Sequence, residues 1–197
     1  RRLCIRDRLI NSPWPIIILV LAGLAWIASR SILLVIGIII SFLMIGYFGM
    51  WKDTMSTLAI ITVATLICLT AGIPMGIFMA RSTRVQAAIL PVLDMMQTIP
   101  SFVYLIPILM LLGIGKVPGL IAVCIYAVPP IIRLTNLGIR EVDKEALEAI
   151  DAFGATTWQS LTKVQIPLTL PTIFAGVNQT IMMALAMVVI ASMIGVK

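Results

Sequence analysis

The residue types that most often carry catalysis are scarce in this sequence, and those present are widely spaced. The 197 residues contain no histidine, and the three cysteines lie far apart, at Cys4, Cys68 and Cys124. The sequence shows no metal-ligand cluster and no nucleophile with a base partner. We therefore expect no enzyme activity, no metal and no cofactor on this chain, and we interpret the cysteines as small apolar groups.

Polar residues gather instead in one segment, from Glu141 to Pro171, which we call the elbow. Five of the eight acidic residues lie between Glu141 and Asp151, which predicts a helix that faces water. Gly154 can adopt a positive φ without steric cost, so two short helices can meet there at a sharp angle. Pro167 and Pro171 suit the start of a new membrane helix, where a missing amide donor is no loss.

A second property of the elbow is its apolar periodicity. Large apolar residues recur at roughly helical spacing around small ones, which predicts an amphipathic helix with a thin face that another protein can approach closely. These large residues are Leu147, Ile150, Trp158, Leu161 and Val164. Two interpretations stay open from this pattern alone: the helix lies on lipid headgroups, or a partner binds it from the water side.

The rest of the chain must hold the elbow at a membrane. Hydrophobic residues make up 61% of the sequence and the mean hydropathy is +1.14, which excludes a soluble domain of this length. The net charge of +6 does not indicate nucleic-acid binding, because the basic residues flank apolar runs and act as topology determinants. We predict an all-α, polytopic helical bundle. Its six apolar runs are residues 14–28, 31–50, 54–80, 85–114, 120–132 and 172–196.

Several of these runs carry features beyond length. The first is short, so it either crosses the bilayer, tilts or lies at the interface. The third contains Gly72, Pro74 and Gly76, which suit either close packing against another helix or a bend that opens a pathway. The fifth is expected to leave the bilayer at Pro129, Pro130 and Arg133. The fourth is too long for one straight crossing, and three prolines divide it: Pro91, Pro100 and Pro107.

Polar side chains inside the runs are candidates for a solute pathway, because polar groups in a span usually face protein or water rather than lipid. Asp94 lies in the fourth run and either faces the pathway or neutralises Arg84 at the membrane edge. Asn and Gln in a span often join helices by hydrogen bonds, and methionine often fills a gap in the core. The pathway candidates are Gln97, Thr98, Ser101, Tyr104, Asn178, Gln179 and Met183.

The basic residues also predict sidedness. The loop from Arg81 to Arg84 is short and basic, and such loops prefer the cytoplasm. Parity across the fourth and fifth runs places the elbow on the same side. Four arginines precede the first run and lie outside if both early runs cross. Either the first run does not span, or this end departs from the positive-inside rule.

Motifs across the chain together resemble a known family. One segment of the elbow has the spacing of the EAA loop of ABC importer membrane subunits, at Glu148, Ala149, Gly154, Val164, Ile166 and Pro167. Ile150 replaces the second alanine of that motif, Val164 its isoleucine and Ile166 its leucine. Four further segments are similar to the permease subunit of the glycine betaine/proline-type ABC importers. They are LDMMQTIPSFVYLIP, GIGKVPG, YAVPPIIRLTNLGI and AGVNQTIMMALAMVVIASMIG.

This resemblance implies a domain division and a coupling role. Residues 1–50 resemble the extra amino-terminal region of that family, with one or two spans. Residues 51–197 resemble its permease core, of the methionine-importer type, whose final helix we expect to be missing. The elbow, about residues 141–171, would be the cytoplasmic loop that couples to an ATPase. The coupling residues implied are Glu145, Glu148, Ala149, Ala152, Gly154, Ala155, Thr156 and Pro167.

The same resemblance implies partners and a function. Two permease copies would surround a central pathway in the inner membrane. A cytoplasmic ABC ATPase dimer would bind ATP and Mg²⁺, and an external binding protein or a fused binding domain would supply the solute. The implied function is import of glycine betaine- or proline-like compatible solutes. Choline, carnitine and trimethylamine oxide stay open as solutes, and an ATP-independent secondary transporter is an alternative that does not account for the EAA spacing.

Overall fold

The computed structural model describes residues 14–194, and the regular elements in that range are all helices. The chain forms two compact units that divide between Ile60 and Ile61, inside the long helix α4 (Trp51–Arg81). The first unit contains α2 (Trp14–Ser29) and α3 (Ile32–Tyr47), each with 16 residues. Both are shorter than the roughly 20 residues that cross a bilayer without tilt or thinning.

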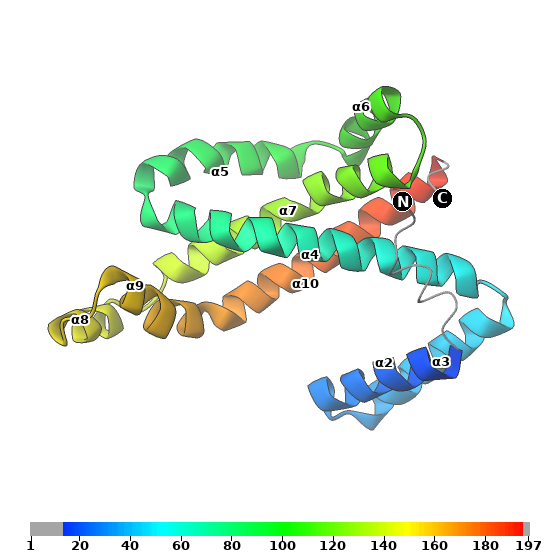
Figure 1. The fold of residues 1–197 in the computed structure, drawn as a ribbon, viewed down its shortest axis with the longest axis horizontal. Coiled ribbons are helices and arrows are strands. Elements are labelled where there is room, and N and C mark those ends of the chain that lie inside the picture. Colours follow the sequence, from blue (N-terminus) through cyan, green and yellow to red (C-terminus); the bar gives the residue numbers. More distant parts are fainter. Residues whose placement is uncertain (1–13, 195–197) are drawn as a thin grey trace. The chain divides into compact units, whose positions relative to one another are not determined.

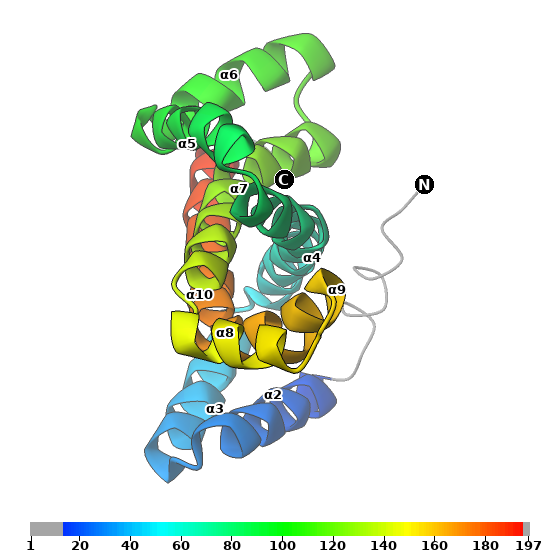
Figure 2. The same ribbon diagram turned by 90° about the vertical axis from the view of Figure 1, so that its left-hand side faces the viewer.

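The second unit is a bundle in which α7 (Lys116–Arg140) and α10 (Ile166–Met193) lie side by side (Figures 1 and 2). α4 packs against α7 at two glycines. A Cβ on Gly76 would lie 2.6 Å from Cβ of Thr135 and 2.8 Å from the carbonyl oxygen of Ile132, so only glycine fits. α4 remains a single helix of 31 residues through Pro74. Of the two interpretations of this segment, close packing is the one observed.

The fourth apolar run forms two helices with a sharp bend between them, either a broken span or a re-entrant loop. α5 (Thr83–Thr98) and α6 (Ser101–Leu112) meet at an angle of 91°. The break falls at Ile99 and Pro100, because a residue before proline is pushed out of the helical region, and Ile99 is extended with ψ 130°. The predicted division at Pro91 and Pro107 is wrong, since both lie inside helices.

The fifth run, expected to end at Ile132, forms a longer helix that does not stop at Pro129 and Pro130. α7 continues through both prolines for 25 residues, and both are buried. A proline removes one backbone hydrogen bond from a helix, and packing against neighbouring helices offsets that loss. The helix therefore reaches Arg140, and the elbow begins directly after it; the point at which the chain leaves the bilayer stays a prediction.

The elbow contains α8 (Lys144–Ala152), α9 (Thr157–Ser160) and the π-helical turn η1 (Leu161–Gln165). η1 passes without a break into α10, which carries Pro167 in its first turn as predicted, whereas Pro171 lies further inside the helix. The second arm of the elbow is thus the start of a membrane helix.

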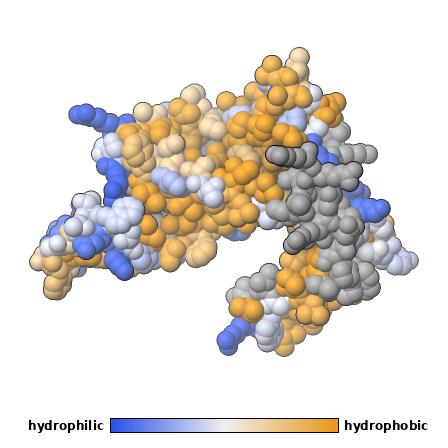
Figure 3. Space-filling model, in the orientation of Figure 1, coloured by the Kyte–Doolittle hydropathy of each residue, from blue (hydrophilic) through white to orange (hydrophobic). Residues whose placement is uncertain are grey.

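Apolar side chains dominate the visible surface of the second unit, and polar residues gather over α8 and α9 (Figure 3). Within the described residues, three helical segments are long and apolar enough to span a membrane: Trp51–Arg81, Lys116–Arg140 and Thr157–Met193. The bent pair α5 and α6 provides a fourth crossing if it acts as one span. The predicted polytopic helical bundle is confirmed.

Candidate coupling site and solute pathway

α8 is an open helix, because none of its nine residues is buried. Asp143 caps its first turn, and the Asp143 carboxylate accepts a hydrogen bond from the backbone N–H of Glu145 at 3.1 Å. Glu145, Glu148, Ala149 and Ala152 are all exposed. Their spacing of three and four residues places them on one face of the helix. That face combines small residues, which allow close approach, with two carboxylates.

Gly154 makes the turn between the two arms of the elbow, with φ at 74°. Nothing lies within 4 Å of the position of a Cβ there, so the backbone conformation rather than space calls for glycine. Ala155 is half-buried. The next residue, Thr156, caps α9 reciprocally with Gln159: the Thr156 hydroxyl accepts from the Gln159 N–H at 3.4 Å, and Gln159 Oε1 accepts from the Thr156 N–H at 2.8 Å.

The predicted apolar face of the elbow does not exist as one continuous stripe. The turn at Gly154 splits its members between two helices: Leu147 and Ile150 are half-buried in α8, while Leu161 is buried in η1. Trp158, expected on the same face, is 66% exposed. The apolar residues do recur at helical spacing, but the turn at Gly154 changes the direction of the chain, so residues on either side of it do not share one helix face.

Two arginines join the end of α4 to the elbow and to the end of α7, and sequence reasoning missed both contacts. Arg81 donates to the carbonyl oxygen of Thr157 at 3.3 Å, and its guanidinium carbon lies 6.0 Å from the ring centroid of Trp158. Arg140, at the end of α7, donates to the carbonyl oxygen of Met79 at 3.3 Å. α4 is thereby joined through Arg81 to the second arm of the elbow, and through Arg140 to the end of α7 just before the elbow. The basic loop had indicated only which side of the membrane this end occupies.

A polar cluster joins α5 to α7. Arg133 forms an ion pair with Asp94, and Arg133 Nη1 donates to Oε1 of Gln97 at 3.1 Å. The alternative that Asp94 neutralises Arg84 is wrong, because Asp94 lies on the face of α5 that meets α7. We call Asp94, Gln97 and Arg133 the polar cluster. Gln97 was among the predicted pathway residues, and facing the pathway was one of the two alternatives for Asp94; Arg133 was not predicted.

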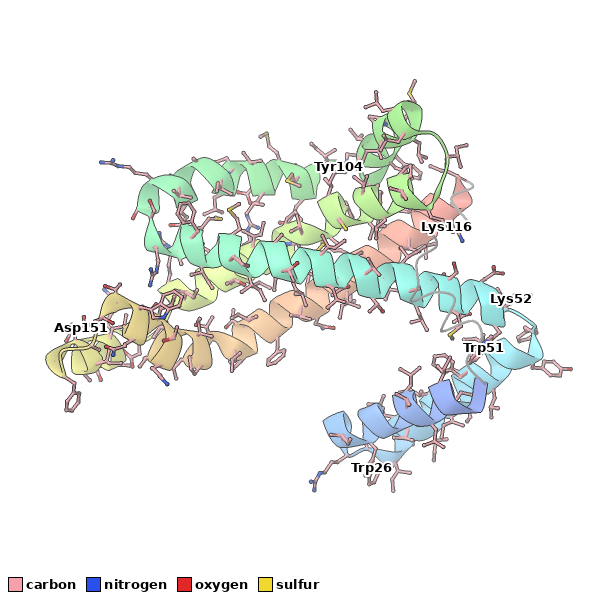
Figure 4. The ribbon with its side chains drawn as sticks, viewed as in Figure 1. Trp26, Trp51, Lys52, Tyr104, Lys116 and Asp151 are labelled. Carbon is pink, nitrogen blue, oxygen red and sulfur yellow. The ribbon has the colours of Figure 1, made fainter. Side chains whose placement is uncertain are left out.

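A tyrosine pair adjoins this cluster. The Tyr104 hydroxyl donates to the carbonyl oxygen of Met96 at 2.8 Å, and the rings of Tyr104 and Tyr126 lie 6.2 Å apart, inclined at 58°. Tyr104 projects from α6 close to the first half of α7 (Figure 4). Thr98, at the end of α5, is exposed, and Ser101 opens α6 half-buried. The structure therefore gathers the four pathway candidates of the broken span around one corner.

The three pathway candidates on α10 stand apart from that corner. Asn178 and Gln179 are exposed, Met183 is half-buried, and none makes a side-chain hydrogen bond with another described residue. The expectation that the two amides join helices is not met within this chain. Their role in a pathway stays a prediction.

Comparison with known proteins places the chain in a family. The sequence profile of the binding-protein-dependent transport system inner membrane component matches residues 72–197. The chain belongs to this family of multi-span inner-membrane proteins, the membrane subunits of ABC importers.

Two relatives narrow the class further. The chain is 52% identical over 188 residues to the glycine betaine/proline betaine transport system permease protein ProW of Escherichia coli, covering 95% of this chain and 53% of that protein. It is 49% identical over 185 residues to the glycine betaine/carnitine transport permease protein GbuB of Listeria monocytogenes, covering 93% of this chain and 66% of that one. The chain thus spans about half of the first relative and 66% of the second.

A solved structure shares the fold. The inward-facing methionine ABC transporter MetNI superposes with a TM-score of 0.63 at 21% identity, over 71% of this chain and 71% of the matched chain. The predicted permease fold of the methionine-importer type is confirmed.

Proposed function

We propose that this chain is the transmembrane subunit of an ATP-driven importer for glycine betaine and related compatible solutes. The chain itself is a transport subunit rather than an enzyme. It forms part of the solute pathway and receives the energy of ATP hydrolysis through the elbow. The relatives' names support glycine betaine as the solute, with proline betaine and carnitine next to it.

The assembly that this function requires has three further parts. A second copy of the chain completes the pathway, since Asp94 and Thr98 on α5 and Asn178 and Gln179 on α10 are exposed in a single chain. A cytoplasmic ATPase dimer holds ATP and Mg²⁺, and an external binding protein or fused domain delivers the solute. Residues 1–50 serve as an amino-terminal membrane region beside the permease core of residues 51–197.

The elbow carries this proposal. Its α8 face of acidic and small residues is open, its turn depends on a glycine at positive φ, and its two ends are continuous with membrane helices. Arg81, Arg140 and Lys163 lie on the elbow's side of the membrane, which favours the cytoplasm. Closure of the ATPase dimer would move both elbows and the helices attached to them, which produces alternating access.

The test is a pair of substitutions at Gly154. Gly154→Val places a β-branched residue at positive φ, which costs about 1–3 kcal/mol and distorts the turn. Gly154→Asn is the matched control, because asparagine tolerates this conformation far better. We expect the Gly154→Val variant to lose the coupling of solute uptake to ATP hydrolysis in the reconstituted complex. The Gly154→Asn variant should keep most of that coupling.

Both variants are measured for membrane insertion, ATPase activity and solute uptake. Unchanged uptake in the Gly154→Val variant would contradict the proposed role of the elbow in coupling uptake to ATP hydrolysis. Failure of the chain to co-purify with any ATPase, together with uptake that needs no ATP, would instead favour the secondary transporter. Competition among glycine betaine, proline betaine, carnitine, choline and trimethylamine oxide for uptake then identifies the solute.

A further inference from the structure

The polar cluster of Asp94, Gln97 and Arg133 has no part in the coupling described above. Arg133 precedes Arg140 by seven residues on α7, so it lies about 10 Å from the end of a helix that is long and apolar enough to span a membrane. The side chains of Arg133 and Asp94 nevertheless keep 38% and 50% of their surface exposed. Charged groups within a membrane-spanning segment need water or protein beside them rather than lipid. The cluster therefore faces a wet pathway or the second copy that borders it.

The tyrosine pair extends the cluster. The Tyr104 hydroxyl binds the backbone of Met96, the residue next to Gln97, at 2.8 Å. Tyr126 precedes Arg133 by two helical turns and shares its face of α7. Aromatic faces attract quaternary ammonium groups, and a guanidinium pairs with a carboxylate through two parallel hydrogen bonds. Both kinds of group stand along one strip where α5 and α6 meet α7.

From this juxtaposition we propose that the polar cluster and the tyrosine pair form a passage subsite for a zwitterion that carries a carboxylate and a quaternary ammonium. The inference rests on the proposed function and names the solute contacts within it. The solute carboxylate pairs with Arg133, and its ammonium lies against Asp94 and the tyrosine rings. One internal ion pair is thereby exchanged for two ion pairs with the solute.

Charge balance explains why such a subsite permits passage. The cluster and the zwitterion are each neutral overall, so no net charge stays behind in the membrane before, during or after occupancy. When the solute leaves, Arg133 and Asp94 re-form their own pair, which competes with the solute and keeps binding weak. A cation without a carboxylate, such as choline, would leave the guanidinium without a partner, which is unfavourable.

A labelling experiment on the assembled complex tests occupancy directly, without ATP turnover. Thr98→Cys places a thiol one helical turn from Asp94 on the same face of α5. We expect glycine betaine to slow its reaction with a membrane-impermeant thiol reagent, whereas choline, acetate and sucrose at equal osmolarity do not. Ile114→Cys, in the exposed α6–α7 turn, is the labelling control that no solute should protect, and the parent chain gives the background.

The guanidinium is then removed in the Thr98→Cys background. Arg133→Gln should raise the glycine betaine concentration needed for protection by about tenfold, since a charged hydrogen-bond partner is lost. Equal protection by all four solutes, or none by glycine betaine while the complex still imports it, would overturn the subsite. Loss of ATPase coupling in the Gly154 variants has no bearing on these labelling rates, so the two proposals fail separately.

A charge exchange separates a solute contact from a purely structural pair. Asp94→Arg combined with Arg133→Asp restores an ion pair between α5 and α7 but reverses its direction relative to the tyrosine pair. We expect this double variant to assemble with its ATPase and to import glycine betaine poorly. Assembly together with full uptake would show that the ion pair only holds helices together, and would overturn the proposal. A second outcome would also overturn it: the charge-exchanged variant fails to assemble, while the neutral double variant, Asp94→Asn with Arg133→Gln, assembles and imports normally.

Discussion

At the scale of single residues, the missing side chain of Gly76 sets the distance between α4 and α7. A Cβ at this position would meet the backbone of Ile132 as well as the Thr135 side chain. Backbone atoms cannot rotate away as a flexible side chain can, so the two helices themselves would have to separate. Gly37 in α3 offers the contrast, because nothing in the described structure lies within 4 Å of a Cβ there.

We expect Gly76→Ala to lower the free energy of unfolding by about 1–3 kcal/mol, the usual cost of overpacking. Gly37→Ala should leave it unchanged or raise it slightly, because alanine is the better helix former. Denaturant titration of the two variants in the same detergent, with helicity as the signal, measures the difference. Equal stability of both variants would contradict the close contact.

Single residues also show where sequence reasoning succeeds. The turn at Gly154 was predictable, because glycine's access to positive φ is a local property. The partner of Asp94 was not, because Arg133 lies on another helix and the nearer Arg84 looked equally suitable in one dimension. Likewise, no local rule relates Arg81 to Trp158. Pairings of this kind depend on which helices pack together, which composition and spacing do not reveal.

At the scale of elements, prolines and periodicity were the less reliable guides. Pro100 breaks a helix, while Pro91, Pro129 and Pro130 do not, although each lacks the same amide hydrogen. In a buried membrane helix, neighbouring helices stabilise the bent or weakened turn, so the outcome depends on packing. The prediction of one apolar face along the elbow was wrong for a related reason. Helical spacing relates residues only within one helix, and the turn at Gly154 divides the elbow into two.

The contacts that join α4 to the elbow and to the end of α7 lead to a prediction about whole elements. Removing them should weaken the coupling of uptake to ATP hydrolysis without preventing assembly of the complex. Arg81→Gln removes the contacts with Thr157 and Trp158, and Arg140→Gln removes the contact with Met79. An exposed cation–π contact contributes only about 0.5–1 kcal/mol, so we expect normal assembly. We expect less solute to be moved per ATP hydrolysed in both variants.

Arg84→Gln is the matched control for these variants, because it removes the same charge three residues from Arg81, and Arg84 makes no side-chain hydrogen bond or ion pair with another described residue. The measured quantity is the ratio of uptake to ATP hydrolysis in proteoliposomes. A ratio in Arg81→Gln equal to that of Arg84→Gln would show that only charge matters, and that α4 is not driven through the elbow.

At the scale of the whole chain, the ends of the α7–α10 pair define the two sides of the membrane. Lys116 lies at one end and Asp151, on α8, beyond the other (Figure 4). We predict that Asp151→Cys reacts with an impermeant thiol reagent only from the ATPase side, and Lys116→Cys only from the opposite side. Right-side-out and inverted vesicles give the two measurements.

Cys4 is replaced by serine in this labelling experiment, while Cys68 and Cys124 stay, because they lie buried and half-buried between α4 and α7. Reaction of both introduced thiols from one side would contradict the predicted sidedness of the elbow.

The continuous helical segment from Thr157 to Met193, which contains α9, η1 and α10, has a mechanical consequence. Its 37 residues extend about 55 Å, whereas the hydrocarbon layer is about 30 Å thick. A stiff body of that length, tilting about a point inside the bilayer, swings its two ends in opposite directions. A push at the water-exposed end would then open a gap on one membrane face in the same stroke that shuts the other. The gates on the two membrane faces would then move together, without a separate element that couples one gate to the other.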